Sequence, residues 1–221
     1  MATQECVILL HALARTTFSM STMESYLKHL NYIVINQDYP TTRKSIKALA
    51  DEDVETMVSQ CQQYLPSQIH FVTHSIGGIV LRSYLKDHKL SHLGRIVMLA
   101  PPNHGSPLAD LLQHNFFYKL IAGPAGQELT THHSSTPNQL TTPTTYQIGV
   151  IAGNFSFNPF SRVFFHEDND GKVGVSSARL DGMKDFIVLP VSHMFMMQNR
   201  TVIKEVAYFL QHGRFTELRS T

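Results

Sequence analysis

A chain of 221 residues, 43% of them hydrophobic, can bury one sizeable core, and we expect a single domain over residues 1–221. The 18 Lys and Arg side chains nearly balance the 17 Asp and Glu side chains, which leaves a formal charge of +1. This balance provides no broad field to attract nucleic acid or an anionic membrane, so neither is an expected partner. No apolar run reaches the roughly 18 residues of a membrane span, so no integral membrane segment is expected.

The first predicted strand, Cys6–Leu10, is apolar enough to resemble part of a secretory signal. It is too short for that role, Glu5 precedes it, no basic stretch lies before it, and no clean cleavage site follows. We therefore expect a strand here and a cytoplasmic protein. Cys6 lies in this strand and Cys61 in a predicted helix, which suggests reduced thiols rather than a disulfide framework.

Six short apolar runs recur along the chain and predict six strands. They are continuous rather than alternating, which is typical of strands covered by helices on both faces. The six runs are Cys6–Leu10, Tyr32–Asn36, Ile69–Thr73, Arg95–Ala100, Tyr146–Ala152 and Asp185–Val191.

Helical patterns lie between most of these strands. The first begins near Met20, where Ser21 and Glu24 have the spacing of a capping box. A longer apolar stripe runs from Ile46 to Leu65 at a helical period and ends at Pro66. Two more helices are expected, one directly after the third strand and one over residues 199–211. Alternating strands and helices predict an α/β fold with a mainly parallel sheet covered on both faces.

The segment from residue 104 to residue 145 breaks this alternation. It holds an apolar stretch, a Gly123-Pro124-Ala125-Gly126 break and a run rich in Thr, Ser and Pro. Because a structureless loop of this length is uncommon in a compact domain, we expect a flap or cap over the C-terminal edge of the sheet. Its apolar side chains either line an acyl pocket, bind an interface or form ordinary core, which we favour. They are Leu108, Leu111, Leu112, Phe116, Phe117 and Ile121.

A serine stands between the third predicted strand and the helix that follows it, in the run Thr73-His74-Ser75-Ile76-Gly77-Gly78. This is the G-x-S-x-G nucleophile elbow with Thr73 in place of the first glycine. A serine in such a tight turn presents its hydroxyl at the positive end of the helix. The same motif also fits an ordinary loop in which the serine caps the helix. The position after the third strand favours the nucleophile.

Several further segments are similar, in the same order, to those of the α/β-hydrolase superfamily. The chain resembles most its small bacterial lipase-type serine esterases, whose opening strand ends in a His-Gly-Leu motif. The similar segments are His11-Ala12-Leu13-Ala14-Arg15, Ala100-Pro101-Pro102-Asn103-His104-Gly105-Ser106, Gly149-Val150-Ile151-Ala152-Gly153, Asn169-Asp170-Gly171-Lys172-Val173 and Val191-Ser192-His193. The resemblance implies an α/β-hydrolase fold.

This resemblance also implies a catalytic triad in the chain order Ser, Asp, His. Ser75 follows the third strand, Asp170 the fifth and His193 the sixth. His193 would take the proton of Ser75, and Asp170 would orient the imidazole and stabilise its charged form. Asp168, in the same loop, is the alternative acid, and Asp185 is a more distant one.

The family takes the two backbone N–H donors of its oxyanion hole from the residue after the nucleophile and from the first strand's loop. These positions are Ile76 and Leu13, with Ala12 where the family has glycine. His11 and His74 are expected to shape the site and to form hydrogen bonds there rather than to carry protons.

No metal and no cofactor are expected, because His132-His133 and His166 lack partners at ligand spacing and no phosphate-binding glycine loop occurs. The expected function is hydrolysis of a small acyl ester or lipid, as in an esterase or lipase, through an acyl-Ser75 intermediate. A thioesterase, amidase or acyltransferase could use the same triad. A non-catalytic binding module is the alternative from another class.

Overall fold

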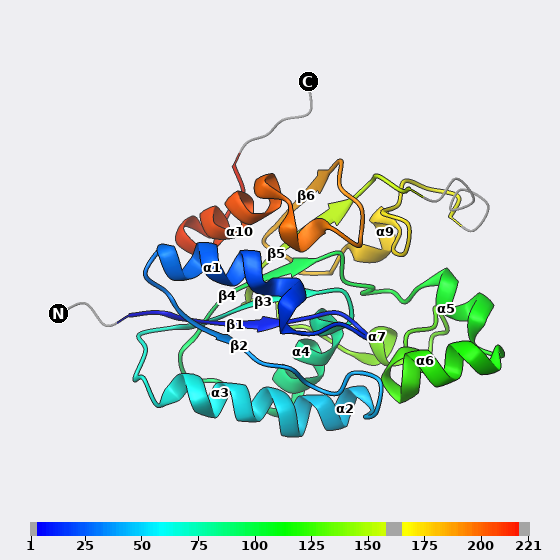
Figure 1. Cartoon of the computed structure of the whole chain (residues 1–221), viewed down its shortest axis with the longest axis horizontal. Helices are drawn as coiled ribbons and strands as arrows, with labels where there is room; N and C mark the ends of the chain where they lie inside the picture. Colours follow the sequence, from blue (N-terminus) through cyan, green and yellow to red (C-terminus); the bar gives the residue numbers. More distant parts are fainter. Residues whose placement is uncertain (1–3, 158–164, 217–221) are drawn as a thin grey trace.

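The computed structural model describes residues 4–157 and 165–216 of the chain (Figure 1). Its centre is a six-stranded, fully parallel sheet in the order β2-β1-β3-β4-β5-β6. All six predicted strands are present, with ends that differ from the predicted ones by at most two residues. They are β1 (Cys6–Leu10), β2 (Ile33–Asn36), β3 (Ile69–His74), β4 (Leu93–Leu99), β5 (Gln147–Gly153) and β6 (Asp185–Leu189). The α/β prediction is confirmed.

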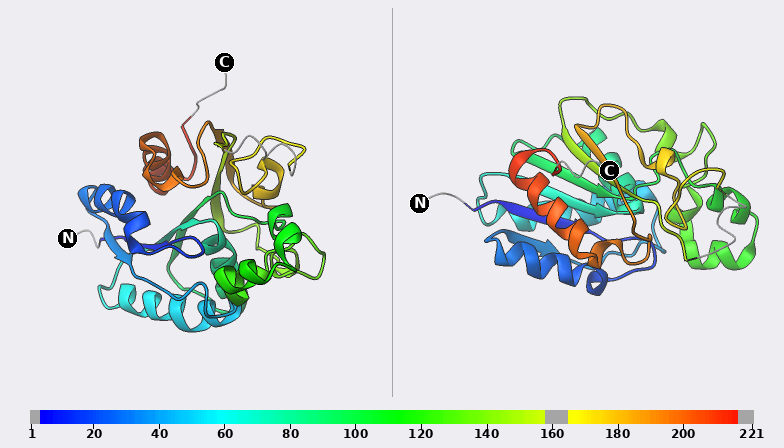
Figure 2. Two further views of the ribbon diagram at one scale, coloured as in Figure 1. Left: turned by 45° about the vertical axis from the view of Figure 1, so that its right-hand side comes forward. Right: turned by 90° about the horizontal axis from the view of Figure 1, so that it is seen from above.

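Helices cover both faces of this sheet (Figures 1 and 2). On one face, α1 (Ser21–His29) and α10 (Arg200–His212) pack on β1 side chains such as Val7 and Leu9. The other face meets Ile8 and carries α4 (Ile76–Asp87) and one continuous helical run. That run comprises α2 (Ile46–Ala48), the wider turns of η2 (Leu49–Val54) and α3 (Glu55–Gln62). The alternation of β1 side chains therefore divides the core into two layers.

The start of α1 differs from the prediction. A short 3-10 turn, η1 (Thr17–Met20), leads directly into it, so Ser21 is already helical. The Ser21 hydroxyl donates to the Phe18 carbonyl at 2.8 Å, and Glu24 binds Lys28 and Asn36 instead of a backbone N–H. The predicted capping box is wrong, because the helix continues from the preceding 3-10 turn and Ser21 is not its first residue.

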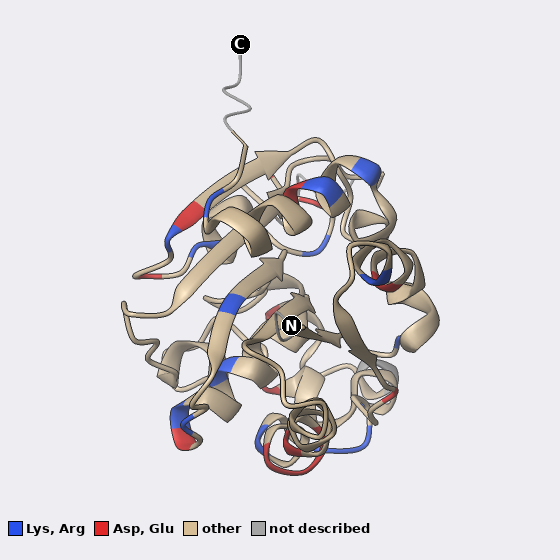
Figure 3. Cartoon of the chain, turned by 90° about the vertical axis from the view of Figure 1, so that its left-hand side faces the viewer, with Lys and Arg blue, Asp and Glu red and all other residues tan. Residues whose placement is uncertain are grey.

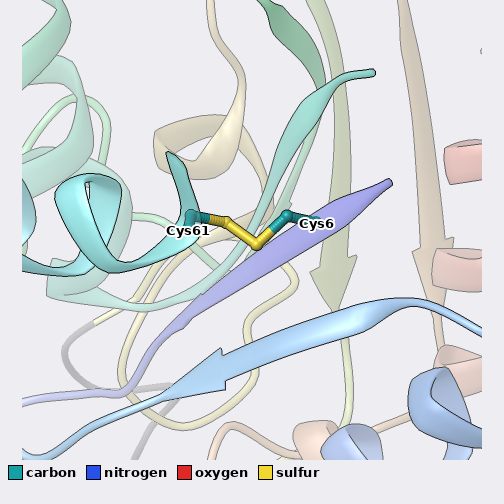
Figure 4. Close-up of a disulfide and its surroundings, with 2 residues drawn as sticks. All are labelled: Cys6 and Cys61. Atoms are coloured by element: carbon teal, nitrogen blue, oxygen red, sulfur yellow. A yellow bond between two sulfur atoms is a disulfide. The ribbon is translucent and has the colours of Figure 1, made fainter. Parts of the chain in front are cut away.

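The two cysteines form a disulfide that joins β1 to α3 (Figure 4). Cys6 and Cys61 are fully buried, and their Cα atoms lie 6.2 Å apart, within the range that a disulfide spans. The expectation of reduced thiols is wrong. Its premise of a buried strand and a helix was correct, but α3 packs directly over β1 and brings both side chains into one layer.

The connection from β4 to β5 forms a small helical layer beyond the C-terminal ends of the strands (Figure 1). It contains α5 (Pro107–Leu112), α6 (Phe116–Gln127) and α7 (Thr136–Gln139). The helix α6 is kinked at Gly123, where φ is 61° and a Cβ atom would collide with the Thr42 carbonyl. Glycine is required at this kink because the chain passes so close to Thr42.

The cap's apolar side chains are not the ordinary core that we favoured. Leu111, Phe116 and Ile121 are 56%, 71% and 64% exposed, and Leu108 faces a cavity. Leu112 is half-buried, and the side chain of Phe117 lies outside the described part. The apolar spacing correctly predicted helices, but little protein covers the outer side of α5 and α6, so these side chains stay exposed. Two short helices complete the described chain, α9 (Val175–Ala178) and η3 (Met196–Gln198).

Candidate active site

Ser75 occupies a strained turn between β3 and α4. Its backbone has φ 55° and ψ −124°, a conformation that residues other than glycine rarely adopt. The Ser75 N–H donates to the Leu99 carbonyl at 2.9 Å, and the Gly78 N–H donates to the Ser75 carbonyl at 3.0 Å. The strand, turn and helix that the motif predicts are therefore present, and hydrogen bonds to β4 and α4 hold the strained residue in place.

Two glycines allow α4 to begin this close to the sheet. A Cβ on Gly77 would lie 2.6 Å from the Leu10 carbonyl oxygen at the end of β1. A Cβ on Gly78 would lie 3.1 Å from Pro101 and 3.3 Å from the hydroxyl of Thr73. The fully buried Thr73 thus occupies space that a side chain at position 78 would need. The departure from G-x-S-x-G is accommodated by the extra glycine.

His193 and Asp170 form a buried hydrogen-bonded pair. His193 Nδ1 lies 2.7 Å from Asp170 Oδ2, and the His193 N–H donates to the Asp170 carbonyl at 3.0 Å. The other carboxylate oxygen accepts the N–H groups of Lys172 and Val173 at 2.9 and 2.8 Å. A carboxylate anion can only accept, so this contact favours the His193 tautomer that has its proton on Nδ1 and Nε2 as an acceptor.

The two alternative acids lie elsewhere. Asp168 is exposed, and its carbonyl accepts the Val175 N–H at 2.9 Å. Asp185 stands at the first residue of β6, the opposite end of the strand from His193, and its carboxylate accepts the N–H groups of Phe186 and Phe215. Of the three candidate carboxylates, the structure joins Asp170 to His193.

A cavity of about 120 Å³ at the C-terminal edge of the sheet is lined by three of the five predicted site residues, and Asp170 and Ile76 are not among its lining residues. Ser75 and His193 both line it, as does Leu13 from the loop after β1. Leu108 and Ala109 of α5 close one side, so the cap contributes to the wall. The remaining lining residues are Ala12, Arg15, His74, Pro102, Ser106, Leu129, Lys172, Val173 and Met194.

The two predicted oxyanion-hole donors are the N–H groups of Leu13, which lines the cavity, and of Ile76, which directly follows Ser75. Within residues 4–157 and 165–216, the N–H groups of Leu13 and Ile76 donate no hydrogen bond. Ala12 fits where the family has glycine because the positive φ of this loop, 53°, falls on Ala14 instead. The Ala14 N–H donates to the Thr41 hydroxyl at 3.0 Å, which holds the loop in place.

His74 and His11 are buried beside the site and favour the neutral form. The His74 ring centre lies 4.8 Å from that of His193. Burial, next the charge that His193 has when protonated, and then the charges of Lys172 and Arg15 hold the pKa of His74 well below the usual 6.5. Burial also lowers the pKa of His11, whose ring lies 4.3 Å from that of Tyr39. The lowered pKa values agree with the expectation that these histidines do not carry protons. His11 Nδ1 lies 3.0 Å from the Ala12 carbonyl oxygen, but both ring nitrogens of His74 lack a partner in the described part, so the expected hydrogen bonds are wrong for His74.

Arg15, Lys172 and Met194 line the cavity but were not among the sequence-based candidates. Each lies next to a residue that was: Arg15 two positions after Leu13, Lys172 two after Asp170, and Met194 directly after His193. A loop that places one side chain at a site brings its neighbours close to it, and this proximity was the signal that could have identified them.

Within the described residues, no group of three or more His, Cys, Asp and Glu side chains converges as a set of metal ligands. In the same part of the chain, no helix has both the length and the apolar character needed to cross a bilayer.

No family model and no curated protein matches the chain in sequence. Solved structures match it in fold. The mature form of the lipase BlEst2 from Bacillus licheniformis superposes with a TM-score of 0.78 at 19% identity, over 95% of this chain and 92% of the lipase. The phospholipase PlaB from Legionella pneumophila, solved with thio-NAD, gives a TM-score of 0.73 at 17% identity. That match covers 94% of this chain but 58% of the phospholipase.

A thermophilic esterase from Thermogutta terrifontis matches with a TM-score of 0.60 at 12% identity, over 96% of this chain and 91% of the esterase. At these identities, the likeness establishes the fold. The six-stranded parallel sheet, the strained serine after β3 and the histidine after β6 agree with it. The chain therefore has the α/β-hydrolase fold that these lipases and esterases share.

Proposed function

We propose that this protein is a serine hydrolase that cleaves carboxylic esters through an acyl-enzyme intermediate. The observation that carries the proposal is His193, which the buried Asp170 holds by a hydrogen bond and which lines the same cavity as Ser75 in its strained turn. Backbone strain at a serine that shares a cavity with a histidine is typical of an activated nucleophile, and this supports the proposal. The lipases and esterases of the same fold add support.

In the first half of the reaction, the Ser75 hydroxyl attacks the ester carbonyl, and His193 Nε2 accepts its proton. The carboxylate of Asp170 stabilises the imidazolium that forms. The negative charge on the carbonyl oxygen is bound by the N–H groups of Leu13 and Ile76, which have no other acceptor among the described residues. His193 then returns the proton to the leaving alcohol, and the acyl group remains on Ser75.

In the second half, water takes the place of the alcohol. His193 accepts a proton from the water as it attacks the acyl-Ser75 carbonyl, and the same two N–H groups bind the oxyanion. Collapse of the intermediate releases the carboxylic acid and returns the proton to Ser75. No step needs a metal or a cofactor.

The substrate class is a small acyl ester or a lipid. The cavity is compact, and its wall from the cap is apolar at Leu108 and Ala109, which suits a short acyl chain or the head of a longer lipid. The related folds include enzymes described as a lipase, a phospholipase and an esterase. Thioesters and amides could react at the same triad, so they belong in the substrate panel.

The test compares Ser75→Ala with Ser91→Ala in turnover of a p-nitrophenyl ester. Ser91 is exposed in the loop before β4, at the opposite edge of the sheet, and is the matched control. We expect Ser75→Ala to lose activity by on the order of 10⁴-fold or more and Ser91→Ala to retain it. Equal turnover in both variants would overturn the proposal, and exclusive turnover of thioesters or amides would reassign the substrate.

The disulfide also bears on where the enzyme works. Disulfides persist in oxidising compartments and are rare in the cytoplasm, so the bond between Cys6 and Cys61 removes one support of the expected cytoplasmic location. We propose instead that the chain folds in an oxidising compartment. Thiol counting on the denatured protein from its native host tests this, because an oxidised chain exposes no free thiol and a cytoplasmic one exposes two.

A further inference from the structure

Two cationic side chains line the candidate active site, and no acidic side chain does. Arg15 reaches the cavity from the loop after β1 and Lys172 from the loop after β5, beside Ser75 and His193. None of the residues that line the cavity is Asp or Glu. Elsewhere, acidic and basic residues are interspersed, as the scattered red and blue segments of Figure 3 show. The side chains that line the cavity are therefore net positive, whereas the charges of the whole molecule nearly balance.

Neither cation has a carboxylate partner in the described part of the chain. The Arg15 guanidinium instead donates to the Met194 sulfur at 3.1 Å, which is a weak acceptor. Three lysines away from the site are paired: Lys44 with Glu52 and Asp53, Lys47 with Asp51 and Asp87, and Lys28 with Glu24. Other cations, such as Lys86 and Lys204, also lack a carboxylate partner in the described part, so what distinguishes Arg15 and Lys172 is their place on the wall of the cavity.

The main chain directs Lys172 to this place. Its N–H donates to the Asp170 carboxylate, and its carbonyl accepts the Ser106 hydroxyl at 3.0 Å. Any residue at position 172 could make these two bonds, so they do not explain the lysine side chain. The carboxylate of Asp170, whose charge acts on Lys172, already accepts from His193 and from the N–H groups of Lys172 and Val173.

The two charges also act on each other. Lys172 is exposed as a whole residue, but neighbouring protein partly desolvates its ammonium group. This desolvation, and next the positive charge of Arg15, lower the pKa of Lys172, while Asp170 opposes the shift. Both cations also contribute to the low pKa of His74. Two like charges that converge on one cavity repel each other, and an anion bound between them would relieve that repulsion.

We propose that the cavity selects esters that carry an anionic group, a carboxylate or a phosphate, close to the scissile bond. This inference rests on the proposed esterase function and specifies its substrate class. The Arg15 guanidinium would bind two oxygens of the anion in its planar fork, and Lys172 would add a compact charge from the other side. The anion would thereby orient the ester carbonyl toward Ser75.

The experiment uses two pairs of substrates, each matched except for charge. In the first pair, the p-nitrophenyl hemiester of glutaric acid is compared with its methyl ester, which places the charge in the acyl part. In the second, lysophosphatidic acid is compared with monoacylglycerol, which places a phosphate in the alcohol part. We expect kcat/KM to favour the anionic member of one pair by roughly tenfold, the scale of one charge-assisted interaction. The favoured pair identifies the source of the anion.

The variants Arg15→Gln and Lys172→Met test which groups cause the preference. Each should lower the anionic-to-neutral ratio of kcat/KM several-fold, and the double variant should abolish the preference. Lys204→Met removes one positive charge from the exposed face of α10 and should leave the ratio unchanged. High salt should reduce the wild-type ratio, because it screens the attraction.

The outcomes distinguish the two proposals. Hydrolysis of neutral and anionic members at equal rates in both pairs overturns the inference and leaves the esterase intact. The same holds for a preference that survives in the double variant. If no member of either pair is hydrolysed by the wild-type protein, the proposed function itself fails.

Discussion

Asp170 and its hydrogen bonds determine the orientation of the histidine before any substrate arrives. One carboxylate oxygen holds His193 Nδ1, and the other is held by two backbone N–H groups of its own loop. Both side chains are almost fully buried, so water competes little for these contacts. In the proposed mechanism, this pair fixes the tautomer that leaves Nε2 free to accept the Ser75 proton.

The variant Asp170→Asn tests this role. An amide has the size of the carboxylate but presents an NH₂ group or a weaker acceptor to His193, which favours the wrong tautomer. We expect kcat for a p-nitrophenyl ester to fall by on the order of 10⁴-fold while the fold is retained, as circular dichroism would show. Asp168→Asn, in the exposed part of the same loop, should have little effect. A large loss in Asp168→Asn and none in Asp170→Asn would transfer the acid role to Asp168.

Among single residues, the sequence identified the nucleophile and the base but left alternatives for the acid. Ser75 and His193 follow from their places after predicted strands, and the structure brings both to one cavity. The family resemblance favoured Asp170 and left Asp168 as the alternative, because three carboxylates share one short loop; the hydrogen bond to His193 now separates them. Arg15 and Lys172 were missed, although each stands two positions after a predicted site residue, because such proximity alone does not show that a side chain faces the site.

The elements of the sheet were predictable because burial on both faces leaves a continuous apolar run in each strand. The pairing of β1 with α3 through the disulfide was not, because it depends on which helix packs over which strand. The same limit applies to the cap. Apolar residues at helical spacing predict a helix, but α5 and α6 leave Leu111, Phe116 and Ile121 exposed beside the cavity.

The disulfide should contribute strongly to stability, because it closes a loop between residues 55 positions apart. Loop-closure entropy gives about 4 kcal/mol for a loop of this length, as an upper value. We expect a reductant to lower the free energy of unfolding by about 2–4 kcal/mol in urea titrations. The Cys6→Ala, Cys61→Ala double variant is the control and should not respond to reductant. An equal response of both proteins, or none in either, would contradict the stabilising role.

Across the whole molecule, three buried histidines couple folding to pH. Burial lowers the pKa of His11, His70 and His74 below the usual 6.5. At low pH, the three imidazoles therefore bind more protons in the unfolded chain than in the folded one. Their contribution to stability is complete above about pH 6.5 and is lost as the pH falls below that value.

His70→Gln tests this coupling away from the candidate site. The glutamine can still accept the Arg95 N–H that His70 Nδ1 accepts at 2.8 Å, but it does not titrate. We expect the free energy of unfolding to fall less steeply between pH 7 and pH 5 in this variant than in the wild type. His29→Gln, at an exposed position of α1, is the control. Identical pH slopes in His70→Gln and the wild type would show that His70 is not part of the effect.

The whole account depends on an activated nucleophile at Ser75, and covalent labelling measures this most directly. The protein is treated with a fluorophosphonate, and the intact mass and the labelled peptide are determined by mass spectrometry. We predict one adduct per chain, located on Ser75 and absent from the Ser75→Ala variant. An unlabelled wild-type protein, or an adduct on a different serine, would contradict the proposed mechanism.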